Sequence, residues 1–306
     1  MVTMHGWIIL DKPLGLGSTQ AVAAIKRGLR QAGHGKVKVG HGGTLDPLAT
    51  GVLPIAIGEA TKLAGRMLDG DKIYDFTLRF GEQTDTLDAE GQVVATSPVR
   101  LTLAEVTAVL PRFTGPITQV PPAYSALKVD GERAYDLARA GEEVVLASRH
   151  VTIHALHTSP AQKGFHSASE RLLEDITLSA HVSKGTYIRS LARDIALALG
   201  TVGHVTMLRR TRAGPFDLSR AIMLDNWDEA VKARELEHLL LPLRAGLDDI
   251  PALFLTPDQA GALRQGRVLA GIAADDGAAF ALLDDVPVAL VDVSGGTVRV
   301  ERGFNL

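Results

Sequence analysis

The sequence predicts a protein of mixed α and β structure, an α+β fold with a large domain over residues 1–247 and a small β-rich domain over residues 248–306. A chain of 306 residues is long enough for this division. Residues 73–80 alternate between two faces, as a half-buried strand does, whereas residues 186–200 carry apolar side chains at helical spacing. Beyond the boundary, short apolar runs separated by Asp and Gly indicate a compact β module.

The large domain begins with a strand over residues 6–10 and a turn-rich loop. A helix follows as far as residue 31, and Ser18 or Thr19 can cap it. The other expected elements are a hairpin over residues 73–94, a capped helix ending near Pro111, a short helix over 131–144, strands near 143–157 and 172–183, a helix ending at Gly200, and a strand running from residue 204 into a turn.

The small domain is expected to start with a strand and a short helix that begins at Thr256 or Pro257. Three strands separated by turns complete it, over residues 278–285, 287–293 and 297–304.

Composition excludes several classes of protein. The chain has no cysteine, which rules out disulfides, a zinc–thiolate site and a cysteine nucleophile. No run is apolar and long enough to span a membrane, and the N-terminus lacks a signal-peptide pattern. We therefore expect a soluble, cytoplasmic protein.

The net charge is −3, but the charges are unevenly distributed. Residues 1–65 carry seven Lys/Arg against three Asp/Glu, a net +4, and residues 179–214 carry six against one, a net +5. The segments over 66–178 and 215–306 have net charges of −5 and −7. The two basic segments either form one positive cleft that attracts a phosphate backbone, or are ordinary solvated faces.

Several segments look like known binding or catalytic motifs but lack their required residues or spacing. Residues 15–19 lack the spacing and the Gly-Lys ending of a P-loop, and residues 85–91 lack the ligands of a calcium loop. In a strand, His150 and His154 would share a face but lie far apart, and His157 would face the other way, so we expect no metal site there. No Ser-His-Asp arrangement can be assembled.

One acidic side chain stands alone in "KVGHGGTLDPLATGVLP", residues 38–54. An Asp-Pro pair often starts a turn, so Asp46 can be a simple turn residue. Alternatively, the glycines let a nucleic acid or nucleotide approach the backbone and meet the Asp46 carboxylate. The local sequence leaves both interpretations open.

Six motifs resemble, in order, those of the bacterial tRNA pseudouridine synthases of the TruB family. The loop motif "VGHGGTLDPLATGVLPIAIGEATK" departs only at Gly42, where many members have threonine. The others are "LDKPLGLGS", "KIYDFTLRFGEQTDTLDAEG", "PPAYSALKVDGERAYDLAR", "SKGTYIRSLARDIALALG" and "GHVTMLRRTRAGPF", so the resemblance covers residues 7–216 nearly throughout. The C-terminal module resembles, more weakly, the PUA domain of the same enzymes.

The resemblance implies the mixed-sheet pseudouridine synthase fold, with a cleft across the sheet, and a small PUA pseudo-barrel. It implies isomerisation of the uridine at position 55 in the T-loop of tRNA, with the base flipped out of its stack. No metal or other cofactor is implied. The implied partner is tRNA, bound through its T-arm stem-loop and, by the PUA-like module, through its acceptor stem. We expect a monomer.

Three residues match catalytic positions of the family. Asp46 matches the catalytic carboxylate, which acts as nucleophile or as general base toward the ribose. Arg189 matches the arginine that pairs with it, although an exposed helix charge is the simpler alternative. Tyr74 matches the tyrosine that stacks on the target base and is a candidate to take its C5 proton, although alternation alone favours a core aromatic.

Four further residues match substrate contacts. Tyr187 matches an aromatic near the base, and Leu208 matches an apolar contact to the base. His41 matches the histidine that enters the space left by the extruded nucleotide, and Lys12 matches a lysine at the edge of the site. The ordinary alternatives are core packing for Leu208, a turn histidine for His41 and a surface charge for Lys12.

Two other functions remain as alternatives. A non-catalytic RNA-binding or tRNA-folding protein would need no carboxylate facing RNA, and the joint presence of Asp46, Tyr74 and Arg189 favours the enzyme. An enzyme acting on small nucleotides is disfavoured by the basic segments and the appended module. The sequence leaves open which intermediate forms: an adduct at C6, an acylal at C1′ or a glycal.

Overall fold

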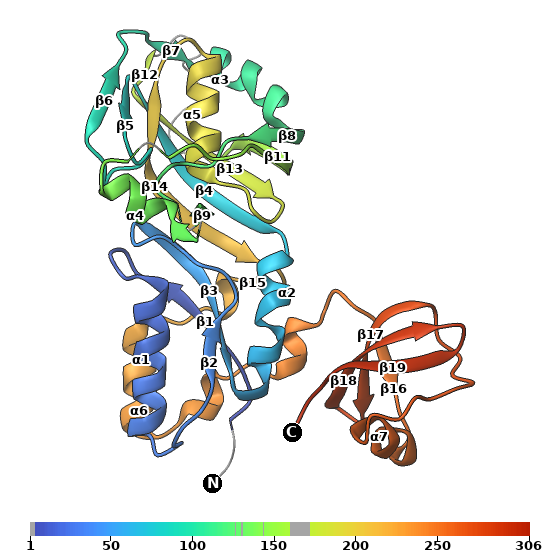
Figure 1. Ribbon diagram of the computed structural model, residues 1–306. Coiled ribbons are helices and arrows are strands. Elements are labelled where there is room, and N and C mark those ends of the chain that lie inside the picture. The colour runs from blue at the N-terminus through green and yellow to red at the C-terminus, as the bar shows by residue number, and fades with distance from the viewer. Residues whose placement is uncertain (1–3, 126, 130, 143, 160–171) are drawn as a thin grey trace. The chain divides into compact units, whose positions relative to one another are not determined.

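The computed structural model describes residues 4–125, 127–129, 131–142, 144–159 and 172–306 (Figure 1). The chain forms two compact units. Unit 1 comprises Met1–Leu45, Val52–Leu68 and Ala213–Leu306, and unit 2 comprises Asp46–Gly51 and Asp69–Arg212. Ala126 and Asp130, within the fourth of the recognised motifs, lie outside the described residues.

Unit 2 is built on a mixed sheet with strand order β14-β4-β13-β11-β8. β13 runs antiparallel to both β4 and β11, and β8 runs antiparallel to β11. The first residues of β3 pair in parallel with β14, so that Leu208 lies opposite Ala49. The strands are β3 (Ala49–Ile57), β4 (Lys72–Phe80), β8 (Gly115–Gln119), β11 (Arg149–Thr158), β13 (Asp175–Val182) and β14 (Gly203–Ala213).

One face of this sheet carries the core of unit 2. Phe76 and Leu78 of β4 are fully buried, as the alternation predicts, and they belong to one cluster with Leu191 and Ile195 of α5. Burying an apolar side chain of this size contributes about 1.5–3 kcal/mol. The apolar stripe of α5 (Ile188–Ala198) therefore fixes this helix, and Arg189 with it, on the sheet (Figure 1).

Smaller elements complete unit 2. Thr102 caps α3 and exchanges hydrogen bonds with Glu105, as the predicted helix start requires. The strand β4 is confirmed, but the expected hairpin over residues 73–94 is wrong: β4 lies between β14 and β13, and the return segment forms a small hairpin of its own, in which β5 pairs with β6. The elements are β5 (Glu82–Thr84), β6 (Val93–Thr96), β7 (Leu101–Thr102), α3 (Leu103–Val109), η2 (Leu110–Phe113), β9 (Lys128–Val129), β10 (Glu132–Arg133), α4 (Ala134–Arg139) and β12 (Leu172–Leu173).

The predicted strand near 143–157 begins only at Arg149, and a β-bulge interrupts its pairing with β13 between Ile153 and Ala155. The bulge shifts the alternation by one residue. His157 consequently lies opposite Ser179, on the sheet face that carries His181, so the prediction that His157 faces away from His154 is wrong.

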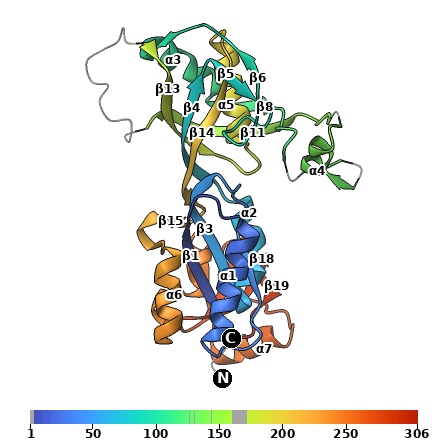
Figure 2. The same ribbon diagram turned by 90° about the vertical axis from the view of Figure 1, so that its left-hand side faces the viewer.

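In unit 1, β1 and β2 flank β3 in the sheet, and α1 packs against α6 (Figure 2). The helix α6 was not predicted. Its Trp227 ring packs against α1 at Gly28 and leaves no space there for a side chain. The elements are β1 (Gly6–Lys12), α1 (Ser18–Gln31), β2 (Val39–His41), η1 (Gly58–Leu63), α2 (Ala64–Asp69), β15 (Phe216–Asp217), η3 (Leu218–Arg220), α6 (Leu224–Ala233), η4 (Leu236–Leu239) and η5 (Leu243–Gly246).

The C-terminal part of unit 1 confirms the predicted β-rich module. Its four-stranded sheet has the order β16-β17-β18-β19 and a core of its own, and Thr256 caps the helix α7 with Pro257 as first residue. The elements are β16 (Ala252–Phe254), α7 (Pro257–Arg264), β17 (Gly277–Leu283), β18 (Val286–Ser294) and β19 (Thr297–Gly303).

Candidate active site

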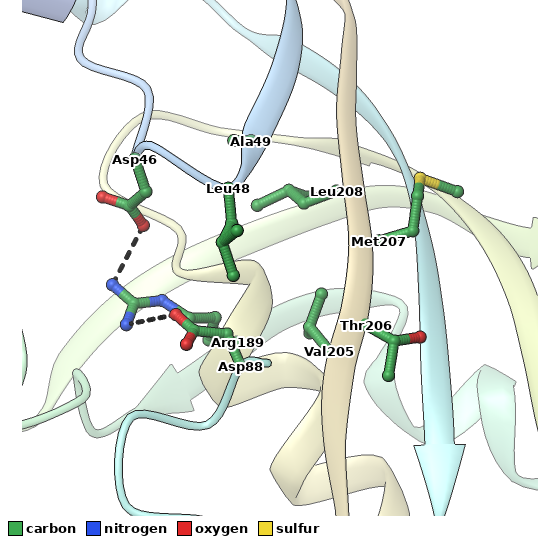
Figure 3. Close-up of a pocket in the computed structure, with 9 residues that line it drawn as sticks. All are labelled: Asp46, Leu48, Ala49, Asp88, Arg189, Val205, Thr206, Met207 and Leu208. Atoms are coloured by element: carbon green, nitrogen blue, oxygen red, sulfur yellow. Dashed lines mark hydrogen bonds and ion pairs between the residues drawn. The ribbon is translucent and has the colours of Figure 1, made fainter. Parts of the chain in front are cut away.

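The carboxylate of Asp46 pairs with Arg189 in unit 2. Asp46 Oδ2 lies 3.0 Å from Arg189 Nη2 (Figure 3). The two partners differ in exposure, because the Arg189 side chain is 8% exposed and the Asp46 side chain is 47% exposed. Asp46 is thus held by a buried cation while its carboxylate remains accessible from solvent. The alternative of Arg189 as an exposed helix charge is wrong.

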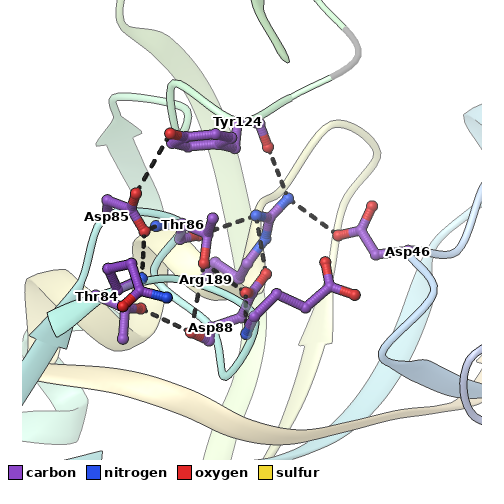
Figure 4. Close-up of polar contacts among 9 residues, drawn as sticks. Asp46, Thr84, Asp85, Thr86, Asp88, Tyr124 and Arg189 are labelled. Carbon is purple, nitrogen blue, oxygen red and sulfur yellow. Dashed lines mark hydrogen bonds and ion pairs between the residues drawn. The ribbon is translucent and has the colours of Figure 1, made fainter. Parts of the chain in front are cut away.

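Arg189 is itself fixed by three further groups (Figure 4). Its Nη1 donates to the backbone oxygen of Thr86 at 2.9 Å and to Asp88 Oδ2 at 3.0 Å. Its Nη2 donates to the backbone oxygen of Tyr124 at 3.0 Å. Hydrogen bonds that involve a charged group are about twice as strong as neutral ones. The guanidinium therefore has one defined orientation, with Nη2 directed at Asp46.

The turn between β5 and β6 holds Asp88 in place. Thr86 Oγ1 donates to Asp88 Oδ1 at 2.6 Å, and the amide of Glu90 donates to the same oxygen at 3.1 Å. Leu87 in this turn has φ of +62°, a left-handed conformation that costs a leucine about 1–3 kcal/mol. Its carbonyl accepts from the Val205 amide at 3.0 Å, which ties the turn to β14. A strained, well-bonded turn thus positions the second carboxylate that pairs with Arg189.

A neighbouring acid in the same turn does not reach Arg189. Asp85 Oδ1 accepts from the amides of Thr86 and Gln92, and Tyr124 Oη donates to Asp85 Oδ2 at 3.3 Å (Figure 4). Burial raises the pKa of the Tyr124 hydroxyl, and the negative charge of Asp85 raises it further.

A small open pocket lies beside the Asp46–Arg189 pair, entirely within unit 2. Its polar lining comes from the ion pairs, and most of the rest is apolar (Figure 3). The pocket thus places the Asp46–Arg189 ion pair against a mostly apolar wall. The residues that line it are Asp46, Leu48, Ala49, Asp88, Arg189, Val205, Thr206, Met207 and Leu208.

The residues next to Asp46 in the chain are tightly constrained. Ser18 Oγ donates to the carbonyl of Leu45 at 2.9 Å and accepts from the Leu45 amide at 2.8 Å. The prediction that Ser18 or Thr19 caps α1 is therefore wrong, because Gly17 occupies the cap position. After Asp46, Gly51 has φ of +98° and contacts the backbone of Arg210 so closely that no side chain fits.

Tyr74 and Leu208 lie at the sheet beside the core. Both are partly buried and pack against the core cluster of unit 2, and Leu208 also lines the pocket. Tyr187 occupies the cap position of α5, where its backbone exchanges hydrogen bonds of 2.8 and 3.1 Å with the Gln119 amide group. The Arg149 guanidinium lies 5.3 Å from the centre of the Tyr187 ring.

His41 and Lys12 belong to unit 1. The Gly43 amide donates to His41 Nδ1 at 3.4 Å. Lys12 is fully buried, and its ammonium donates to the carbonyls of Pro13 and Leu16 at 3.0 and 2.6 Å. The surface-charge interpretation of Lys12 is therefore wrong.

Asp88, Thr86 and Tyr124 were not singled out from the sequence. For Thr86 and Asp88 the available signal was the concentration of acids in "TDTLDAEG", which was tested as a calcium loop, and Tyr124 lies in the motif "PPAYSALKVDGERAYDLAR". Their role depends on a pairing with Arg189, which lies 101 residues beyond Asp88 in the chain.

Comparison with known proteins agrees with this fold. The family model "TruB family pseudouridylate synthase (N terminal domain)" matches residues 29–188, and the "tRNA pseudouridylate synthase B C-terminal domain" model matches residues 189–248. A tRNA pseudouridine synthase B of Novosphingobium aromaticivorans is 67% identical over 303 residues, which cover 99% of this chain and 98% of the relative. A tRNA pseudouridine synthase B of Zymomonas mobilis is 56% identical, with 99% and 96% covered.

Solved structures show the same fold. A chain from the crystal structure of a Cbf5-Nop10-Gar1 complex matches with a TM-score of 0.72 and 26% identity, covering 98% of this chain and 85% of that one. With its mixed sheet and its similarity to these family models and relatives, the protein is a pseudouridine synthase. Within that class, the chain belongs to the TruB family, as its motifs indicate. No helix among the described residues is long and apolar enough to cross a membrane.

Proposed function

We propose that this protein isomerises uridine 55 in the T-loop of tRNA to pseudouridine, with Asp46 as the catalytic carboxylate. The ion pair between Asp46 and the buried Arg189 is the observation that carries the proposal. A carboxylate that only formed a turn would need no cation fixed by Asp88, Thr86 and Tyr124. The printed names of the relatives, which are tRNA pseudouridine synthases, support the same substrate class.

The reaction breaks the N1–C1′ bond of uridine and forms a C5–C1′ bond to the same ribose. C5 loses its proton and N1 gains one, so substrate and product are isomers and no co-substrate is consumed. Asp46 acts at the ribose or the base, as nucleophile or as general base. Arg189 holds the Asp46 carboxylate in place through their ion pair, which positions charge before the reaction begins.

The remaining predicted residues are assigned to substrate binding. Tyr74 stacks on the flipped uracil, and its hydroxyl is the candidate acceptor of the C5 proton. Leu208, which lines the pocket, contacts the base, and Tyr187 lies close to it. His41 contacts the RNA around the extruded nucleotide, and the buried Lys12, whose ammonium donates to the carbonyls of Pro13 and Leu16, holds the loop at the edge of the site.

We extend the proposal to domains and partners. Residues 1–247 form the catalytic domain and bind the T-arm, and residues 248–306 form a PUA-like domain that contacts the acceptor stem. The net charge of −7 over residues 215–306 indicates that this module binds RNA weakly by itself. The protein works as a monomer in the cytoplasm.

The test uses a tRNA T-arm stem-loop that carries tritium at C5 of its uridines. Wild-type protein should release tritium, and mapping should place the pseudouridine at the position of uridine 55. Asp46→Asn keeps the shape of the side chain and removes its charge, so turnover should disappear while RNA affinity stays within a few-fold of wild type. A variant that keeps a tenth of the wild-type rate would remove Asp46 from its catalytic role. An inactive wild type that still binds the stem-loop would instead favour a non-catalytic RNA-folding protein.

A further inference from the structure

Three potential metal ligands meet on the sheet of unit 2. Asp71 directly precedes β4, His181 lies in β13 and His154 lies in β11, so they come from three neighbouring strands. His154 Nε2 lies 3.2 Å from Asp71 Oδ2, and His181 Nε2 lies 3.5 Å from the same oxygen. All three side chains are more than a third exposed, and none of them lines the pocket beside Asp46.

His154 lies at the bulge in β11, next to His181 of the neighbouring strand. Ile153 pairs with Val182 and Ala155 pairs with His181, which leaves His154 as the extra residue between them. The imidazole rings of His154 and His181 lie side by side, with centres 4.7 Å apart. β-Bulges commonly re-aim one side chain next to a functional site.

The spacing of the three ligand atoms fits a tetrahedral metal ion. Zinc binds histidine nitrogen and carboxylate oxygen at about 2.0–2.2 Å. Two ligands of a regular tetrahedron with bonds of that length are about 3.3–3.6 Å apart. The measured separations of 3.2 and 3.5 Å from Asp71 Oδ2 match this value, and all three ligand atoms lie within 4.8 Å of one another.

We propose that Asp71, His154 and His181 bind one divalent transition-metal ion, for which zinc is the best match. Imidazole ligands select zinc, copper or nickel over magnesium and calcium, which prefer oxygen donors. Water completes the coordination. The ion fastens β4, β11 and β13 to one another on the sheet face opposite the apolar core, and it takes no part in the isomerisation. The competing explanation is that protonated histidines simply form ion pairs with Asp71.

The test measures zinc binding to RNA-free protein without an affinity tag, by competition with a chromophoric zinc indicator. Wild-type protein should bind one equivalent. Asp71→Asn, His154→Ala and His181→Ala should each weaken binding at least about tenfold, because even loss of an outer-shell partner costs roughly 10–100-fold in metal affinity. His157→Ala is the matched control, because His157 is an exposed histidine of the same strand that lies outside the cluster. The zinc affinity of this variant should equal that of the wild type.

Two outcomes would overturn the proposal. Either the wild type shows no saturable zinc binding, or the three ligand variants bind zinc as tightly as His157→Ala. Cobalt(II) gives an independent readout, because its visible absorption reports the coordination geometry and should be lost in His181→Ala. Circular dichroism of the metal-free variants separates a lost ligand from a lost fold.

Discussion

Replacing Asp88 by asparagine tests whether the second carboxylate positions Arg189 for catalysis. Asparagine has the same shape, and its Oδ1 can still accept from Thr86 Oγ1 and the Glu90 amide. The other atom of the group becomes an N–H donor that faces Arg189 Nη1 at the former 3.0 Å contact. The substitution therefore removes one charge and one charge-assisted hydrogen bond, and leaves the turn otherwise intact.

The expected loss of rate and stability follows from the hydrogen bond that the substitution removes. A hydrogen bond to a charged group contributes about 1.5–3 kcal/mol, and each 1.36 kcal/mol corresponds to a tenfold change in rate. If a less firmly held Arg189 positions Asp46 less well and the whole of this free energy is lost from the transition state, the single-turnover rate should fall roughly 10- to 150-fold. The free energy of unfolding should fall by about 1–3 kcal/mol. Leaving a buried charge without any partner costs roughly 3–5 kcal/mol of stability. The loss in Asp88→Asn should be smaller than that, because Arg189 still has Asp46 as a partner.

The assay compares the single-turnover rate, the affinity for the T-arm stem-loop and the urea midpoint of Asp88→Asn with those of Asp85→Asn. Asp85 lies in the same turn and is bonded to Thr86, Gln92 and Tyr124, but it does not contact Arg189. The control should therefore keep a rate close to wild type. An Asp88→Asn variant with an unchanged rate, or a control that slows equally, would refute the positioning role.

Three further predictions concern the proton acceptor, RNA binding and pH. Tyr74→Phe keeps the ring and loses the hydroxyl, so the single-turnover rate should drop by about 10²–10⁴-fold while RNA affinity changes only a few-fold; an unchanged rate would leave Tyr74 as a stacking platform or a core aromatic. RNA affinity should fall steeply between low and physiological salt, by about 0.9 log units per decade of salt for each phosphate contact, and a flat titration would contradict the idea that the two basic segments bind phosphates. Burial, and then the Arg210 guanidinium, lower the pKa of Lys72 from its ordinary 10.5 to about 8. Between about pH 8 and 10 the unfolded state thus binds more protons, so stability should rise with pH, and melting curves of Lys72→Met should lack this part of the rise.

Local patterns in the sequence were sufficient for most of the strands and helices. The alternation over residues 73–80 predicts β4, and the capping pair Thr102 and Glu105 predicts the start of α3, because both signals depend on residues a few positions apart. The family motifs also identified Asp46 and Arg189 as candidate partners, and the structure pairs them. Their catalytic roles remain predictions that the proposed experiments test.

Only the tertiary structure decided which distant groups meet. Asp88 reaches Arg189 because the β5–β6 turn is tied to β14, and no local propensity encodes that approach. Serine is a common helix cap, but the Ser18 hydroxyl forms its hydrogen bonds with the backbone of Leu45 instead. The bulge in β11 depends on its pairing with β13 and reverses the alternation that the sequence suggested for the histidines. Hydrophobic period and capping act over one turn or one strand, whereas strand register and side-chain pairing are settled only when segments far apart in the chain pack together.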